Sequence, residues 1–98
     1  MYVIRDVFNC KPGQSKSVAE KFNSSIKLMQ NMEGFVSARV LVDYVANYWT
    51  VVLESEVENL ADFERHMSEY AAREEFREAL SGYMEQVNGG HREIFRVL

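Results

Sequence analysis

Cysteine, proline and long apolar runs are all scarce in this sequence. It has one cysteine and one proline, and its longest purely apolar runs are only a few residues. A lone Cys10 cannot form an internal disulfide or a four-ligand metal site, so we expect a small buried side chain in a reducing cytoplasm. The short apolar runs predict no membrane span, and Arg5 and Asp6 lie where a signal peptide would carry its apolar stretch. A cytoplasmic protein without a membrane contact is therefore predicted.

An excess of basic charge is lacking as well. Acidic residues outnumber basic ones by 15 to 11, which gives a formal net charge of −4. Because phosphate binding requires a clustered basic surface, nucleic acid is not an expected partner. With 47% apolar and 27% charged residues the composition is that of a folded protein, and 98 residues suffice for only one domain. Residues 1–98 are therefore predicted to form a single domain.

The N-terminal third of the chain reads as a strand, a turn and a helix. Residues 2–10, YVIRDVFNC, are rich in β-branched and aromatic side chains, and the breakers Pro12 and Gly13 follow them. An apolar stripe then recurs at helical spacing, at Val18, Phe22, Ile26 and Met29. We expect an amphipathic helix that ends near Gly34, where glycine suits a left-handed cap.

The middle of the chain carries the alternation of two strands. Within residues 35–45 one parity is apolar and is expected to face the helices: Val36, Ala38, Val40 and Val42. Residues 48–57 resume the pattern with Trp49, Val51, Leu53 and Val57. Ala46-Asn47 is a plausible short turn between the two segments, so a β-hairpin is predicted.

A second helical region follows the hairpin. Asn59 is expected to be its N-cap, and Asp62 is favoured there by the helix dipole. One apolar stripe consists of Phe63, Met67, Tyr70 and Ala71, and the next, out of phase with it, of Phe76, Leu80, Tyr83, Met84 and Val87. This change of phase predicts a break near Ala72 and Arg73.

The C-terminal segment is expected to form the last strand. Gly89 and Gly90 should end the helical region, and residues 91–98, HREIFRVL, should be extended. Alternation assigns Phe95 and Val97 to the face that meets the helices. The opposite parity holds Arg92, Ile94 and Arg96. His91 is most simply an exposed residue at the start of the strand.

The element order β, α, β, β, α, β predicts an α+β fold of the ferredoxin-like type, with the helices on one face of an antiparallel sheet. No further element remains to cover the other face. We expect that face to expose Leu41, Tyr48, Val52 and Ile94, and a contiguous apolar face is more often an interface than open surface. A homodimer is therefore predicted, with the non-helical faces packed into a closed α+β barrel. Charged side chains on this face should pair or stay at the wet rim: Arg39, Asp43, Glu54, Arg92 and Arg96.

Three short motifs carry a resemblance to a known family. CKPG closes the first strand, EGF opens the second, and a strand and helix run from VLESEVENLADFERHM to REEFREAL. Over nearly its whole length the chain resembles the dimeric α+β barrel proteins, which include the antibiotic-biosynthesis monooxygenases. The resemblance implies a ligand pocket between each sheet and its helices. It also implies cofactor-free oxidation of aromatic polyketides or quinols, or degradation of haem, as activities of family members.

The candidate site residues follow from this resemblance and from the patterns. Phe63 and His66 match the family's Phe-x-x-His, whereas Glu75 stands where many relatives have a second His. The haem-degrading branch uses an Asn, a Trp and a His; Asn9 and Trp49 are present here, but the later part of the helical segment has no His. His66 is the candidate acid or base. Trp49 could stack a flat ligand, and Tyr70 and Tyr83 could direct hydroxyls into the same cavity.

Each of these residues also has an ordinary structural interpretation. His66 could be a packed side chain at the helix flank, and Trp49, Tyr70 and Tyr83 could simply fill the core. No metal is predicted, because the glutamates of REEFRE, residues 73–78, alternate with arginines as on a solvated helix face, and no cofactor is predicted. Two functions stay open. One is a cofactor-independent, monooxygenase-like enzyme acting on a small aromatic or quinol-type molecule; the other is a non-catalytic small-molecule-binding or structural homodimer.

Overall fold

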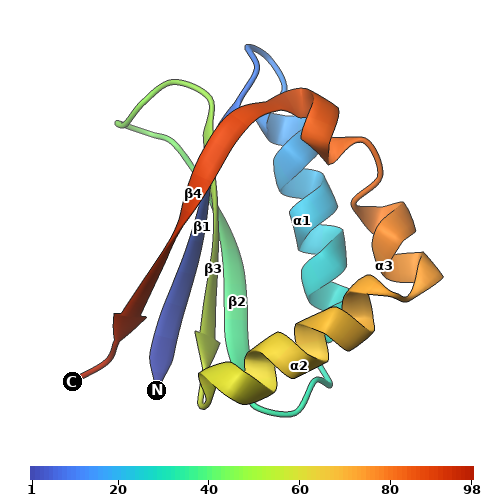
Figure 1. Ribbon diagram of the computed structural model, residues 1–98. Coiled ribbons are helices and arrows are strands. Elements are labelled where there is room, and N and C mark those ends of the chain that lie inside the picture. Colours follow the sequence, from blue (N-terminus) through green and yellow to red (C-terminus); the bar gives the residue numbers. More distant parts are fainter.

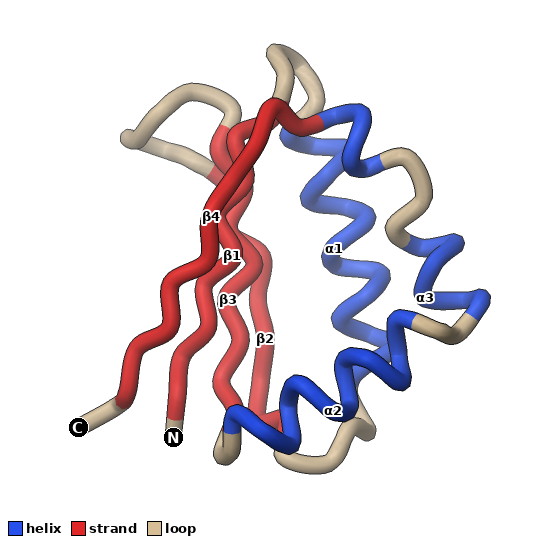
Figure 2. The backbone as a smooth tube through the Cα atoms, viewed as in Figure 1, coloured by secondary structure: helices blue, strands red, loops and turns tan.

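The computed structural model describes residues 1–98 as one antiparallel sheet with every helix on the same face (Figure 1). The strands are β1 (Tyr2–Cys10), β2 (Phe35–Val42), β3 (Thr50–Val57) and β4 (Val87–Arg96). The helices are α1 (Ser15–Met29), α2 (Leu60–Ala71), α3 (Glu74–Ala79) and the 3-10 turn η1 (Tyr83–Gln86). Figure 2 shows the two layers, with strands in red and helices in blue.

The strand order is β2-β3-β1-β4, and every neighbouring pair is antiparallel. The first strand of the chain is therefore central, and the last strand adds beside it at one edge. This is the order of a ferredoxin-like sandwich, so the predicted α+β class and ferredoxin-like fold are confirmed. No helix in the structure has the length and apolar character needed to cross a membrane.

The core lies between the helices and the inward parity of the sheet. One cluster of buried side chains consists of Ile4, Met29, Met32, Val57, Phe63, Tyr70 and Phe76. A second consists of Cys10, Val18, Phe22 and Val51. Along β1 the even-numbered residues face the helices, because Ile4 and Cys10 are buried in these clusters and Phe8 packs against the second. Asp6 shares that parity and is the one charged residue on it.

Local signals located the helices well. The stripe of α1 is buried at Val18, Phe22 and Met29, but the helix already ends at Met29. Gly34, which was expected to be its cap, adopts the left-handed conformation with φ 80° in the turn that leads to β2. At the start of α2 the side chain of Asn59 accepts a hydrogen bond from the backbone N–H of Asp62 at 3.1 Å. The N-cap and the break at residues 72–73, between α2 and α3, are both confirmed.

The hairpin differs from its prediction. β2 ends at Val42 and β3 begins at Thr50, so residues 43–49 form a loop rather than a two-residue turn, and Trp49 lies outside the strand. Two bonds to Thr50 close this loop: its N–H donates to Asp43 Oδ1 at 2.9 Å and its hydroxyl to Asn47 O at 2.7 Å. Such bonds from side chains compete with strand pairing and are not visible in an apolar pattern.

The start of β2 also departs from strict alternation. A register shift between Phe35 and Ser37 places Phe35 against the core, while Val36 is 44% exposed. The predicted inward position of Val36 is therefore wrong, and Phe35 takes it. Ala38, Val40 and Val42 keep the predicted face, because they pair with the inward residues Ser55, Leu53 and Val51.

β4 carries the largest correction. It begins at Val87, so Gly89 and Gly90 lie inside the strand and do not end the helical region. The pairing Asp6↔Arg92 and Ile4↔Ile94 places Arg92, Ile94 and Arg96 on the helical face, and Phe95 on the other. The predicted parity of this strand is therefore inverted. The cause is that both parities of an edge strand carry apolar side chains here, so alternation alone does not determine the face.

The non-helical face carries a row of alternating charges across all four strands. Arg39 of β2 contacts Glu54 of β3 at 2.7 Å, and the Nε of Arg5 in β1 lies 3.7 Å from Glu54 and 3.9 Å from Glu93 of β4. Leu41 and Val52 lie on this face as predicted, but Val52 is only 7% exposed and not open to solvent as expected. Ile94 does not, and Tyr48 belongs to the 43–49 loop, which extends beyond this face in Figure 1. Arg92 and Arg96 also leave the predicted set, because the register of β4 places both on the helical face, where Arg92 pairs with Asp6. Asp43 leaves it too, because it belongs to the 43–49 loop and accepts the Thr50 N–H.

Candidate functional site

A cleft of about 440 Å³ opens between the sheet and the helices. Its walls are mostly apolar and come from every layer of the fold: Phe8, Phe22, Met29, Leu53, Met67 and Phe76. α2 and α3 are separated by the break at residues 72–73, and each contributes to the wall, α2 through Met67 and α3 through Phe76. A cleft of this size, apolar with a few polar groups, has the character of a small-molecule site.

An ion pair lies at one side of this cleft. Arg92 Nε donates to Asp6 Oδ1 at 2.5 Å, and a second guanidinium nitrogen lies 3.4 Å from Asp6 Oδ2. The hydrogen bond that Arg92 donates to Asp6 is the main cause that raises the pKa of Arg92 above its usual value. The Asp6 side chain is 17% exposed and that of Arg92 54%, so the pair stands at the mouth of the cleft.

Three aromatic rings form one wall. The centroids of Phe8 and Phe22 are 4.8 Å apart, and Tyr83 lies 5.4 Å from Phe22 and 6.0 Å from Phe8, edge-on to the latter. These are favourable ring geometries, and they present a continuous aromatic surface to the cleft.

The position of Tyr83 depends on a hydrogen-bond network that connects η1 to α1. The side-chain amide of Gln86 donates to Gln14 at 2.9 Å and to Ser17 at 2.8 Å, and Lys21 donates to its oxygen. All four side chains are partly buried, and their bonds tie the short η1 turn to the side of α1. This hydrogen-bond network therefore holds Tyr83 in its place in the aromatic wall.

The four residues predicted for the site are not brought together. Tyr83 lines the cleft. Tyr70 is 8% exposed and belongs to the core, with the Arg73 guanidinium 4.2 Å from its ring centroid. His66 lies on α2 outside the cleft, with Nε2 3.9 Å from the Glu33 carboxylate and Nδ1 3.6 Å from that of Glu69. The catalytic role of His66 and the ligand-binding roles of the other three stay predictions.

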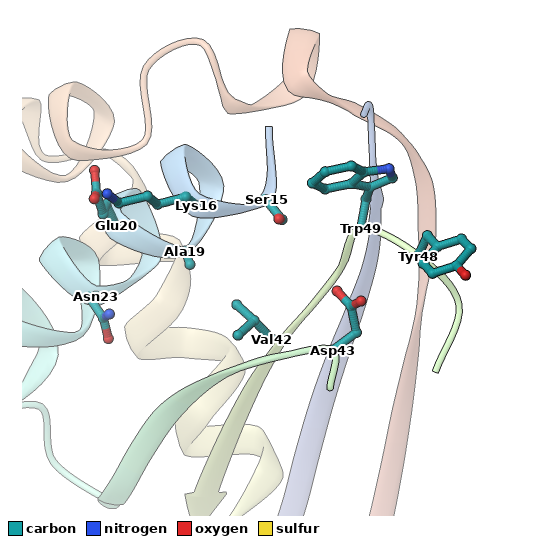
Figure 3. A pocket seen from close by; sticks show the side chains of 9 residues that line it. All are labelled: Ser15, Lys16, Ala19, Glu20, Asn23, Val42, Asp43, Tyr48 and Trp49. Atoms are coloured by element: carbon teal, nitrogen blue, oxygen red, sulfur yellow. The ribbon is translucent and has the colours of Figure 1, made fainter. Parts of the chain in front are cut away.

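Trp49 lines a different hollow. This second space, of about 390 Å³, lies between α1 and the end of the β2–β3 loop (Figure 3). The expectation that strand alternation would direct Trp49 into the cavity beside the second helical segment fails, because the residue precedes the strand and has φ 62°.

Sequence reasoning missed Asp6 and Arg92 as site residues. A signal for Asp6 was present, because an acid stands alone on the inward parity of Tyr2, Ile4, Phe8 and Cys10. A carboxylate on a core-facing position is expensive unless it is paired, which points to a partner or to a function. No comparable signal existed for Arg92, because its face depends on the register of β4.

The remaining reactive groups are accounted for by packing. Cys10 is 3% exposed, and burial, followed by the charge of Asp43, raises the pKa of its thiol. Its nucleophilic thiolate form is therefore disfavoured. The structure contains no group of three or more His, Cys, Asp or Glu side chains arranged to hold a metal ion.

Comparison with known proteins places this geometry in context. Residues 1–80 match the family described as antibiotic biosynthesis monooxygenase. A solved structure from Nitrosomonas europaea, described as an antibiotic biosynthesis monooxygenase, superimposes with a TM-score of 0.77 at 14% identity, covering 100% of this chain and 99% of that one. A structure from Chloroflexus aurantiacus with the same description has a TM-score of 0.75 at 11% identity, covering 99% of this chain and 92% of that one. The structure of a conserved protein from Methanosarcina mazei superimposes with a TM-score of 0.76 at 16% identity, covering 97% of this chain and 90% of that one. No curated protein matches the chain.

Proposed function

Since the chain belongs to the antibiotic biosynthesis monooxygenase family, we propose that it oxidises a small phenol or hydroquinone with dioxygen and without a bound cofactor. The observation that carries the proposal is the Asp6–Arg92 pair at the side of an apolar cleft with an aromatic wall. An aromatic ring with one acidic hydroxyl matches both parts of this site. The ring would lie against Phe8, Phe22 and Tyr83, and the hydroxyl would reach the ion pair.

The chemistry assigned to the pair is the activation of the phenol. The Asp6 carboxylate takes the hydroxyl proton, and the Arg92 guanidinium stabilises the phenolate that forms. A phenolate is electron-rich at the ring carbon para to its oxygen, and this carbon transfers electrons to dioxygen. The para C–H bond breaks and a C=O bond forms there, while the second oxygen atom leaves as water. One phenol and one dioxygen thus give one quinone and one water. A hydroquinone has no para C–H bond; it loses two electrons and two protons to dioxygen, so one hydroquinone and one dioxygen give one quinone and one hydrogen peroxide.

Oxygen uptake tests this proposal directly. The protein should consume dioxygen with an electron-rich phenol that has a free para position, and quinone should accumulate in equal amount. Ala71→Trp should reduce the rate about tenfold or more, because Ala71 lines the cleft and a large side chain there occupies the ligand's space. Ala61→Trp is the matched control, since Ala61 is an exposed position on the same helix that does not line the cleft. No uptake across a panel of phenols and hydroquinones would refute the proposal.

One observation favours the second candidate, a non-catalytic binding protein. The two charged groups of the cleft already satisfy one another, so Asp6 is not a free base in the empty site. A binding protein would hold the same aromatic ligands and release them unchanged. A rise in Tm with a phenol, without dioxygen uptake or quinone formation, would support this alternative.

We also infer that the chain forms a homodimer through the non-helical face of its sheet. That face combines apolar Leu41 and Val52 with the charge row from Arg39 to Glu93, and Phe95 on it is 52% exposed. A second copy placed by two-fold symmetry would bring an equivalent row, whose carboxylates would face the exposed part of the Arg5 side chain, which is 37% exposed within one copy. An interface of ordinary size, above roughly 1,000 Å², would cover such a face.

A pair of neighbouring residues tests the interface. Phe95→Asp should raise the dimer dissociation constant about tenfold or more, because it places a carboxylate in a covered apolar contact. Ile94→Asp should leave the dimer intact, because Ile94 is similarly exposed, at 48%, but lies on the helical face. Light scattering measures the outcome. A wild-type mass of 11.4 kDa would exclude the dimer, and equal effects of the two variants would show that the interface lies elsewhere.

A further inference from the structure

The hollow at Trp49 is separate from the cleft and combines an aromatic surface with carboxylates. Figure 3 shows the indole extending from the end of the β2–β3 loop toward Ser15 and Ala19 of α1, with Val42 and Asp43 beneath it in this view. The indole is 40% exposed, so one of its surfaces stays open to a ligand. Val42 is 57% exposed and supplies an apolar patch beside it. The Trp49 ring is therefore a wall of this hollow and not a side chain of the core.

The backbone of Trp49 is held in an unfavourable conformation. It is the only residue other than glycine with a positive φ, 62°, a region that bulky residues rarely adopt. Its carbonyl accepts a hydrogen bond from the Cys10 N–H at 2.8 Å, and Thr50 beside it is bonded to Asp43 and Asn47. A glycine would meet the same backbone without strain. Because Trp49 is large and half exposed and still retains this backbone strain, its side chain is inferred to have a role of its own.

The charges around the indole favour a cation. Asp43 uses one carboxylate oxygen to accept the Thr50 N–H at 2.9 Å, and its other oxygen makes no hydrogen bond or ion pair. Glu20 and Lys16, one turn apart on α1, also line the hollow, but Figure 3 shows both side chains on the side away from the indole. Asp43 is therefore the carboxylate beside the ring. The open oxygen of Asp43 belongs to the residue that also closes the loop carrying Trp49.

We propose that this hollow, formed by Trp49, Val42, Ala19 and Asp43, is a second ligand site that binds an alkylammonium group. The ammonium would lie against the indole ring, where cation–π attraction acts, with its alkyl groups on Val42 and Ala19. The free oxygen of Asp43 supplies the counter-charge. The site is independent of phenol oxidation, because its residues and those of the cleft do not overlap.

The fluorescence of Trp49 provides the test, because it is the only tryptophan in the chain. Choline is the probe, and 3,3-dimethylbutan-1-ol is the control, since it has the same shape without the charge. Choline should change the emission saturably at constant ionic strength and bind about tenfold more tightly than the alcohol, the ratio expected for a cation against an aromatic ring and a carboxylate. Equal affinities for the two probes, or no saturable change together with no heat of binding by calorimetry, would overturn the proposal.

Two variants identify the groups responsible. Asp43→Asn retains the oxygen that accepts the Thr50 N–H and removes the charge, so choline should bind several-fold more weakly while the alcohol is unaffected. Glu58→Gln, an exposed carboxylate outside the hollow, should change neither. Trp49→Gly should relieve the backbone strain and abolish choline binding as measured by calorimetry, with folding checked by thermal melting. Wild-type choline affinity in folded Asp43→Asn or Trp49→Gly would place the binding elsewhere and refute the site.

Discussion

Gly90→Ala is expected to destabilise the protein by about 3 kcal/mol, near the upper end for overpacking in a well-packed site. A Cβ atom at this position would lie 2.2 Å from the carbonyl oxygen of Val7 and 3.3 Å from the Cα of Phe8. Both contacts are backbone atoms of β1, so no side chain can rotate away to make room. For a domain of this size the loss corresponds to a fall in Tm of roughly 15 °C, which calorimetry or circular dichroism would measure.

Gly89→Ala is the matched control in the same strand. A Cβ at position 89 would meet no atom within 4 Å. We therefore expect a change within about 1 kcal/mol, with a slight gain from reduced freedom of the unfolded chain. Similar losses for both variants would mean that glycine is needed here for strand flexibility and not for the close approach of β4 to β1.

The close approach of β4 to β1 at Gly90 also positions Arg92 in the cleft. Gly90 pairs with Phe8, and two residues later Arg92 pairs with Asp6 on the same face. Displacement of β4 would therefore separate Arg92 from Asp6. We expect Gly90→Ala to lose ligand affinity in the cleft even at temperatures where it is still folded.

Asp6→Asn is expected to lower the rate of phenol oxidation roughly a hundredfold, the lower part of the range for losing a general base. Asparagine keeps the size of the side chain and an oxygen that can accept from Arg92 Nε, but it cannot take a proton from the substrate. The effect should appear in kcat more than in KM, because the ring contacts with the aromatic wall are unchanged. Oxygen uptake at saturating phenol measures it.

Glu93→Gln is the control for Asp6→Asn. Glu93 follows Arg92 directly, but it lies on the non-helical face, where it pairs with Arg5 and not with the substrate. The same rate as wild type is expected. If Asp6→Asn retained the wild-type rate, the assignment of Asp6 as the proton acceptor would be wrong, and the pair would be a positioning element only.

The apolar stripe of α1, the start of α2 and the break after it could be predicted from the sequence alone. In α1 the buried side chains Val18, Phe22 and Met29 recur at the helical period on one stripe. Asn59 caps α2 through its own side chain, and the change of phase at residues 72–73 marks the end of that helix. These are local interactions within a few residues of the chain, so the pattern that encodes them is visible without a neighbour.

The β2–β3 loop and the edge strand depended on contacts that no local pattern shows. Thr50 bonds Asp43 and Asn47, which widens the predicted turn and leaves Trp49 outside the strand. In β4, alternation assigned Phe95 to the helical face, but each parity of the strand carries an apolar side chain, Ile94 on one and Phe95 on the other, so the pattern was a weak signal and the assignment was wrong. The register with β1, with its shift between Asn9 and Cys10, decided that Phe95 faces away from the helices.

The candidate sites, too, were in part predictable from the sequence and in part visible only in the tertiary structure. A cavity between the sheet and the second helical region followed from the resemblance, and Tyr83 does line the cleft found there. The pairing of Asp6 with Arg92, which are 86 positions apart, came only with the tertiary structure. So did the separate hollow at Trp49. The physical reason is that a helix stripe is specified by residues three or four positions apart, whereas the face of an edge strand and its polar partners are specified by register with a distant strand.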